Sequence, residues 1–223
     1  MIMRHDTDNT AGPVARTGTE RHPLMPFLPG NARLLMLGSF PPKKERWSMD
    51  FFYPNFNNDM WRIIGMVFFG DRRYFETCCG EATDGKPRKF DRERITGFCS
   101  GKGIALYDAA CEVRRLRDNA SDKFLEIVTP TDIGALLASI PECNTIAATG
   151  EKAAEAVSAY FGCGQPATGH SIIIDLHKYA GNGLQGRDTL TFWRMPSSSR
   201  AYPLALDAKA GIYRQMFIDA GLL

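Results

Sequence analysis

The 223-residue sequence lacks the features of membrane-spanning, collagen-like and intrinsically disordered proteins. No stretch approaches the roughly 18 to 20 consecutive apolar residues that a membrane span requires. Glycine does not recur at every third position, and 44% of the residues are hydrophobic, which is too many for a disordered chain. The 27 basic and 25 acidic residues nearly balance, so net charge neither requires nor excludes a nucleic-acid partner. The composition therefore indicates one globular domain.

The six cysteines form no C-x-x-C pair, which is the spacing typical of zinc and iron–sulfur sites. The adjacent Cys78 and Cys79 are poorly placed to form a disulfide with each other. Residues 1–20 contain no apolar segment of the kind that directs secretion. We therefore expect reduced thiols, no metal and no other cofactor, in a cytoplasmic protein that does not contact membranes.

Strand-like and helix-like segments alternate along the chain. Short, almost wholly apolar runs, which are typical of parallel strands buried on both faces, lie at residues 33–38, 103–107, 145–149 and 189–193. Helical periodicity or capping signals lie between and after them, from Asp59 onward and at residues 131–140, 151–161 and 207–220. This alternation predicts an α/β protein, a three-layer α/β/α sandwich with a mainly parallel central sheet.

Two segments fall outside this alternation. Residues 1–22 are polar and without periodicity, which predicts a flexible tail, so that one domain covers residues 23–223. Residues 162–187 are rich in glycine but include an apolar run at 171–175, which predicts a hairpin-like excursion from the domain.

In a parallel α/β sheet, ligands bind beyond the carboxyl ends of the strands. The first candidate site follows the strand predicted at residues 33–38. Gly38 permits a tight exit from the strand, and two prolines stiffen the chain after Phe40. The backbone amides of Ser39 and Phe40 can then face a ligand carbonyl. The alternative is an ordinary turn between a strand and a loop.

A second candidate lies at residues 51–61, where aromatic residues precede three asparagines and a predicted helix. An aromatic ring such as that of Tyr53 can stack on a flat base. The carboxamide of Asn58 offers both a donor and an acceptor to a base edge or a held water. The alternative is that the asparagines cap the helix and the aromatic rings belong to the core.

Two further segments contain basic residues. Ser197, Ser198, Ser199 and Arg200 follow the strand predicted at residues 189–193, and their hydroxyl and guanidinium groups can bind phosphate or enter a base stack. The alternative is a serine- and proline-rich connector. Residues 86–94 are basic but interrupted by acidic residues, and a solvated face is the favoured interpretation.

In their order and spacing these segments resemble the uracil-DNA glycosylase superfamily. The resemblance is closest to the branch that excises deoxyinosine, the hypoxanthine-DNA glycosylases, which are akin to the mismatch-specific uracil glycosylases. The stretches that carry it are Leu-Gly-Ser-Phe-Pro at 37–41, Phe-Phe-Tyr at 51–53 with Asn-Asp-Met-Trp at 58–61, Gly-Ile-Ala-Leu-Tyr-Asp at 103–108, Thr-Gly-Glu-Lys-Ala-Ala at 149–154 and Met-Pro-Ser-Ser-Ser at 195–199.

The resemblance implies a metal-free, monofunctional DNA glycosylase with a central four-stranded parallel sheet. Such an enzyme hydrolyses the N-glycosidic bond of a deaminated base, hypoxanthine or uracil, that is flipped out of DNA, and so begins base excision repair. We expect a monomer whose partner is damaged or mismatched DNA. Two alternatives remain: a nucleic-acid binding module that kept the fold without the chemistry, and an enzyme acting on a free nucleobase or nucleotide.

The resemblance also implies roles for individual residues. The loop at Gly38, Ser39 and Phe40 would hold the flipped base, with Ser39 at the position where most members of the superfamily carry a catalytic Asn or Asp. The catalytic amide would come instead from Asn58, three residues before a tryptophan, and Tyr53 would stack on the base. The loop that closes on the duplex and contacts DNA would consist of Ser197, Ser198, Ser199 and Arg200.

Overall fold

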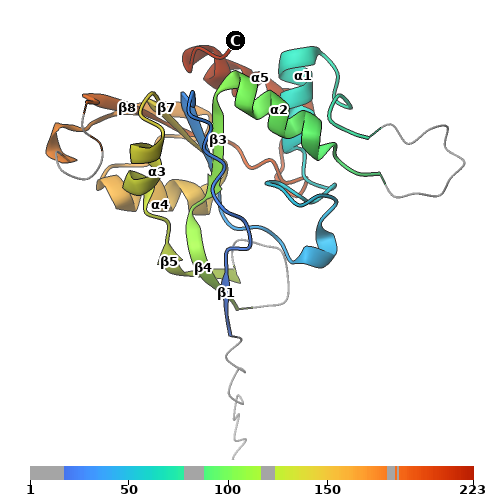
Figure 1. Ribbon diagram of the computed structural model, residues 1–223, viewed down its shortest axis with the longest axis horizontal. Coiled ribbons are helices and arrows are strands. Elements are labelled where there is room, and N and C mark those ends of the chain that lie inside the picture. The colour runs from blue at the N-terminus through green and yellow to red at the C-terminus, as the bar shows by residue number, and fades with distance from the viewer. Residues whose placement is uncertain (1–17, 78–87, 117–123, 180–183, 185) are drawn as a thin grey trace, which may run out of the picture.

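The computed structural model describes residues 18–77, 88–116, 124–179, 184 and 186–223, and it has a mixed α/β fold (Figure 1). Its main sheet has five strands in the order β3-β2-β6-β8-β7. The strands are β2 (Leu34–Gly38), β3 (Ile104–Asp108), β6 (Thr145–Ala148), β7 (His170–Asp175) and β8 (Thr189–Arg194). The four predicted strands are the parallel ones, β3, β2, β6 and β8.

The expectation of a four-stranded parallel sheet is wrong by one strand. β7 pairs antiparallel with β8 and makes the sheet mixed. The predicted hairpin-like excursion is therefore partly an edge strand, although residues 180–183 and 185 within it lie outside the described residues. An edge strand buries few side chains, and of the apolar run at residues 171–175 in β7 only Ile174 is buried.

The register of the parallel strands brings their carboxyl ends together. β2 is buried along its whole length between β3 and β6. Gly38 at the end of β2 pairs with Asp108 at the end of β3, and Leu37 pairs with Ala148 at the end of β6. Ala148 pairs in turn with Arg194 of β8. Residues that follow these four strands therefore meet at one edge of the sheet.

The α-helices of the described residues form two groups. Phe68 of α1 contacts Phe98 of α2 and Phe217 of α5, with ring centroids 4.9 Å apart in both pairs. Figure 1 shows this group to the right of β3 and the pair α3 and α4 to its left. No helix in the described ranges is long and apolar enough to cross a membrane. The helices are α1 (Met60–Phe69), α2 (Arg92–Lys102), α3 (Ile133–Ser139), α4 (Glu151–Phe161) and α5 (Leu206–Asp219).

Four of these helices match the predicted segments, whereas α2 does not. The basic run at residues 86–94 was expected to be a solvated face, and the helix begins within it. The side chain of Asp91 accepts a hydrogen bond from the amide of Arg94 and so caps the helix. Only Ile95 and Cys99 of α2 are buried, which is too few for a clear helical periodicity in the sequence.

A second, antiparallel sheet joins β1 (Thr19–Arg21), β4 (Ala110–Arg115) and β5 (Leu125–Pro130) in the order β1-β4-β5. The predicted tail therefore extends too far, because residues 19–22 are structured. β1 pairs with β4, and the amide of His22 donates to the carbonyl of Cys111. A three-residue polar strand held by backbone bonds has no apolar pattern to reveal it. Residues 1–17 and the pair Cys78–Cys79 lie outside the described residues.

Candidate functional site

A cavity of about 160 Å³ lies at the carboxyl edge of the parallel strands. Each parallel strand contributes to its lining: Ser39 follows β2, Asp108 ends β3, Thr149 follows β6 and Ser197 lies beyond β8. An engineered protein cavity of about 150 Å³ accommodates benzene, so this volume is large enough for at least one flat ring. The position and size of the cavity together favour a small heterocycle as its ligand.

Asp108 reaches the floor of the cavity because Gly38 has no side chain. A Cβ atom on Gly38 would lie 2.2 Å from Oδ1 of Asp108, which is closer than atoms can approach. The other carboxylate oxygen, Oδ2, accepts a hydrogen bond from Nε2 of His22 at 2.9 Å, and the two side chains are only 9% and 2% exposed. Oδ2 is thus held by His22, while Oδ1 faces Gly38 beside the cavity.

His22 is itself fixed on its other side. Its Nδ1 lies 2.8 Å from the carbonyl oxygen and 3.1 Å from the amide nitrogen of Leu24. The ring also packs edge-on against Phe40, with centroids 5.2 Å apart. Because a carboxylate can only accept, Nε2 carries the hydrogen of the bond to Asp108. His22, which follows β1 of the second sheet, thereby orients Asp108, which ends β3 of the main sheet.

Tyr53 forms part of the cavity wall in a constrained backbone conformation. Its φ angle is +50°, a region that non-glycine residues seldom occupy. The hydroxyl of Thr149 lies 3.1 Å from the carbonyl of Leu37, to which it donates, and so it accepts from the phenol of Tyr53 at 2.8 Å. Burial, and next the charge of Asp108, raise the pKa of Tyr53. The Tyr53 side chain is therefore uncharged, and its hydroxyl is held by the hydrogen bond to Thr149.

Asn58 stands at the start of α1, and its carboxamide is oriented by the helix. Oδ1 accepts a hydrogen bond from the amide of Met60 at 2.9 Å, which satisfies one of the free amides at the helix N-terminus. The atom facing that N–H must be oxygen, so Nδ2 is the group that Asn58 can offer to a ligand in the cavity. The N-cap position of α1 is Asp59, so Asn58 supports the helix from one residue before the cap. This contact is compatible with the site interpretation, in which Asn58 has a donor to offer a ligand.

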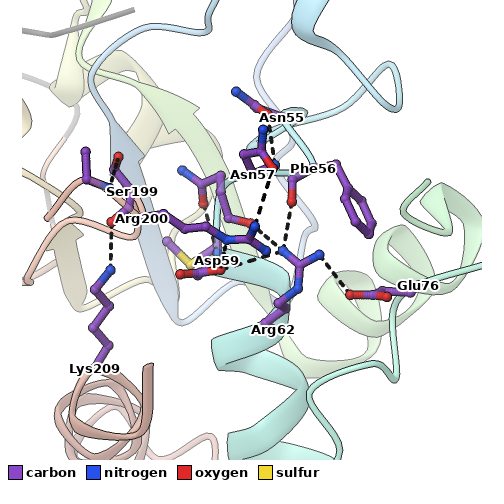
Figure 2. A network of polar contacts seen from close by, with 12 residues as sticks. Asn55, Phe56, Asn57, Asp59, Arg62, Glu76, Ser199, Arg200 and Lys209 are labelled. Carbon is purple, nitrogen blue, oxygen red and sulfur yellow. Dashed lines mark hydrogen bonds and ion pairs between the residues drawn. The ribbon is translucent and has the colours of Figure 1, made fainter. Parts of the chain in front are cut away.

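The loop at residues 197–200 is fastened to the start of α1 and to α5 (Figure 2). The carbonyl of Ser198 accepts from the amide of Asp59 at 2.9 Å, and the carbonyl of Ser199 accepts from Nζ of Lys209 at 2.7 Å. Burial lowers the pKa of Lys209, and the charge of Asp59 opposes this effect. The loop and the segment containing Asn58 are therefore held as one unit.

Arg200 is turned away from the cavity that its neighbours line. Its Nε donates to Oδ1 of Asp59 at 2.9 Å, and its NH1 lies 3.4 Å from Oδ1 of Asn57. Its side chain is 48% exposed, so the guanidinium lies at the surface beside the cavity mouth.

The buried Arg62 holds the backbone of residues 56–58 in place (Figure 2). Arg62 donates to the carbonyls of Phe56 and Asn58 at 2.8 and 3.1 Å, and pairs with Glu76 at 2.9 Å. Its guanidinium also lies 4.4 Å from the ring centroid of Phe56. Burial lowers the pKa of Arg62, and Glu76 counteracts this. This network holds the backbone on both sides of Asn57.

The structure brings together most of the residues expected from the sequence. All of them line the cavity except Arg200: Gly38, Ser39, Phe40, Tyr53, Asn58, Ser197, Ser198 and Ser199. His22, Asp108 and Thr149 were not predicted as site residues. Asp108 and Thr149 could have been found, because each stands at the end of a predicted parallel strand. His22 had no local signal, since its partner Asp108 is 86 residues away.

Comparison with known proteins bears on the fold. The chain is similar to a "putative uracil DNA glycosylase" from Methanosarcina acetivorans, whose solution structure was determined by NMR. The match has a TM-score of 0.58 and 19% sequence identity, and covers 92% of this chain and 99% of the other. The likeness is therefore one of fold. No protein-family model and no curated protein matches the sequence.

Proposed function

We propose that this protein is a monofunctional DNA glycosylase. It hydrolyses the N-glycosidic bond of a deaminated base, hypoxanthine or uracil, flipped out of DNA, and so initiates base excision repair. One observation carries the proposal: a ring-sized cavity is walled by Tyr53, with the Asn58 carboxamide and the Asp108 carboxylate in its lining. The fold shared with the Methanosarcina acetivorans protein supports it.

The Asp108 carboxylate gives a physical basis for choosing deaminated bases. Uracil and hypoxanthine carry a ring N–H where cytosine and adenine have an unprotonated ring nitrogen. A carboxylate can accept from that N–H but is repelled by the lone pair of cytosine or adenine. His22 holds Asp108 in place through Oδ2, so Oδ1 is the acceptor that we assign to the base.

Breaking the glycosidic bond develops positive charge on the sugar and negative charge on the departing base. In our proposal Nδ2 of Asn58 and the backbone amides at Ser39 and Phe40 donate to the base as that charge develops. Water then adds to the sugar carbon, and the proton it releases balances the charge on the base. A neutral carboxamide cannot take that proton, so Asn58 acts by stabilising the leaving group rather than as a general base.

Extrusion of the base from the duplex costs a few kcal/mol, and less at a mismatch or lesion. Stacking on the Tyr53 ring offsets about 1–3 kcal/mol of that cost. The Tyr53 phenol is already neutral at neutral pH, and burial raises its pKa further, so the base that becomes negatively charged meets an uncharged ring. The loop at residues 197–200 would contact the duplex beside the vacated position, with the half-exposed Arg200 guanidinium, which pairs with Asp59, at the surface next to it.

The test is to incubate the protein with duplexes containing uracil or hypoxanthine and then cleave abasic sites with alkali. Strand breaks at the modified base are expected. Retarded migration of the duplex without breaks would instead indicate a binding module that lacks the chemistry. If neither is observed, the alternative of an enzyme acting on a free nucleobase or nucleotide takes the place of this proposal.

A further inference from the structure

The cavity of about 160 Å³ described above is called the base cavity from here on. Another hollow, of about 390 Å³, adjoins it and shares the lining residues Asn55 and Asn57 with it. It lies between the turn η1 (Lys44–Arg46) and the residues that precede α2. We call it the basic groove. Its lining residues are Glu45, Arg46, Trp47, Ser48, Asn55, Phe56, Asn57, Arg88 and Lys89.

The charge of the groove is predominantly positive. Arg46, Arg88 and Lys89 are exposed, and Glu45 is the acidic residue among the lining residues. Within the described ranges none of these three cations takes part in an ion pair. Exposed cations without acidic partners attract polyanions, because no internal salt bridge has to be broken.

The groove also contains an aromatic residue, Trp47, that is hydrogen-bonded to the lining of the base cavity. Trp47 donates from its indole N–H to the carbonyl of Pro42 at 2.7 Å. The amide and the hydroxyl of Ser48 both donate to the carbonyl of Pro54, at 2.9 and 2.8 Å. Pro42 and Pro54 both line the base cavity. Hydrogen bonds therefore link the lining of one hollow to the lining of the other.

We propose that the basic groove binds the phosphodiester backbone of the strand that carries the flipped nucleotide, on one side of that nucleotide. This inference rests on the proposed function, because it takes the base cavity as the place where the strand is anchored. A strand whose base occupies the cavity has to leave it over the rim. Asn55 and Asn57 line both hollows, so a strand that leaves the cavity on their side enters the groove.

Cations and an aromatic ring along one groove are the combination that binds single-stranded nucleic acid. Phosphate contacts of this kind supply affinity that does not depend on sequence and that falls as salt concentration rises. The Lys44 ammonium, 5.6 Å from the Trp47 ring centroid, adds a further positive charge at this end of the groove. The groove would therefore extend the DNA contact beyond the nucleotide that is excised.

The test compares two double variants that remove the same charge. Arg88→Ala/Lys89→Ala changes the groove, and Lys178→Ala/Arg214→Ala removes one lysine and one arginine from η3 (His177–Tyr179) and α5, outside the groove lining. Fluorescence anisotropy gives the Kd for a labelled undamaged duplex over a range of salt concentrations. We expect the groove variant to bind on the order of 10-fold more weakly at 0.1 M salt, with a salt slope shallower by about 0.9 for each phosphate that the variant no longer neutralises.

A second measurement locates the binding surface along the strand. Substrates are shortened on the 5′ or the 3′ side of the modified base, and kcat/KM for excision is measured with the parent protein and both variants. We expect shortening on one side alone to lower kcat/KM in the parent protein and in the control, but to have little further effect in the groove variant. The excision rate at saturating enzyme should be the same in all three proteins.

The outcomes separate this inference from the proposed function. If the parent protein excises a base but the groove variant matches the control in Kd, salt slope and length dependence, the groove inference is overturned and the proposed function remains. If no base is excised while the groove variant alone binds DNA more weakly, the proposed function fails and the groove remains a DNA-binding surface. If the parent protein does not bind DNA, the groove inference is overturned directly.

Discussion

Asn58 combines two tasks in one carboxamide. Oδ1 accepts a hydrogen bond from the amide of Met60 in α1, and Nδ2 is the donor that we assign to the departing base. Replacement by alanine would remove both, at a cost of about 0.5–1.5 kcal/mol of stability from the missing hydrogen bond alone. A loss of activity in that variant would therefore not identify the donor.

Asn58→Asp separates the two tasks, because a carboxylate can still accept from Met60 but has no N–H to donate. We expect stability close to that of the parent protein and an excision rate lower by about 10²- to 10³-fold, as observed when one donor to a developing anion is removed. Single-turnover excision and thermal unfolding are the two measurements. Full activity in Asn58→Asp would remove Nδ2 from the mechanism.

Asp108 is the residue on which the proposed choice of base depends. In Asp108→Asn the new amide can donate to the unprotonated ring nitrogen of cytosine or adenine, which the carboxylate repels. We expect the ratio of kcat/KM for uracil over cytosine to fall by about 10- to 100-fold, equivalent to about 1–3 kcal/mol of discrimination.

The matched control for Asp108→Asn is His22→Gln, which leaves the carboxylate in place but weakens its support. That variant should lose activity on uracil without gaining activity on cytosine. An unchanged uracil-to-cytosine ratio in Asp108→Asn would show that the carboxylate does not face the base.

Among the structural elements, the loop at residues 197–200 and the start of α1 act as a pair. Backbone bonds join Ser198 to Asp59, and Lys209 reaches from α5 to the carbonyl of Ser199. Lys209 is 1% exposed, so a carbonyl left without its buried donor is costly. The position of the loop thus depends both on α5, which follows it in the sequence, and on the start of α1, which is far from it in the sequence.

Lys209→Met tests this dependence, because methionine fills the volume without donating to Ser199. We expect KM for the DNA substrate to rise while kcat changes little, since Lys209 positions the loop and lines no part of the cavity. The amide of Asp59 should exchange its hydrogen faster as the loop loosens. Lys152→Met, which removes a lysine paired with Glu155 on α4, is the control. A fall in kcat with unchanged amide exchange would contradict this role.

At the scale of the whole molecule, buried thiols and phenols make the free energy of unfolding depend on pH in the alkaline range. Burial raises the pKa of the Cys143 thiol from 9.0 to about 11, and burial also raises the pKa of Tyr213. In the unfolded chain these groups ionise at their ordinary values. As pH rises through 9 the unfolded state loses protons that the folded state keeps, so folding becomes less favourable.

We therefore expect the free energy of unfolding to decrease as pH rises from about 9 to about 11. Urea denaturation at a series of pH values measures it. Cys143→Ala should be less stable at neutral pH because it loses buried volume, but its decline with pH should be shallower. A decline equally steep in the variant would show that other groups carry the linkage.

Much of the architecture follows from local sequence. The four parallel strands and four of the helices were predicted because buried strands are continuously apolar and amphipathic helices are periodic. β1, β4, β5 and α2 were not predicted, because none of them combines a continuous apolar run or a clear periodicity with buried side chains. The apolar run in β7 was left open as part of a hairpin-like excursion. The same reasoning placed Ser39 and the serine loop near one sheet edge, since parallel strands end there together. Tyr53 and Asn58 follow no predicted strand, and their place in the site was expected from the resemblance to the uracil-DNA glycosylase superfamily.

The sequence alone thus determined the α/β architecture and the sheet edge at which a site would form, because these depend on local hydrophobic patterns, whereas most of the residues around the site were expected from the order and spacing of motifs. Tertiary structure decided how the polar groups are used. It paired His22 with Asp108, turned Nδ2 of Asn58 into the available donor and directed Arg200 to Asp59 rather than into the cavity. A polar side chain is fixed by whichever partner the fold brings within hydrogen-bonding distance, and neither periodicity nor composition records that partner.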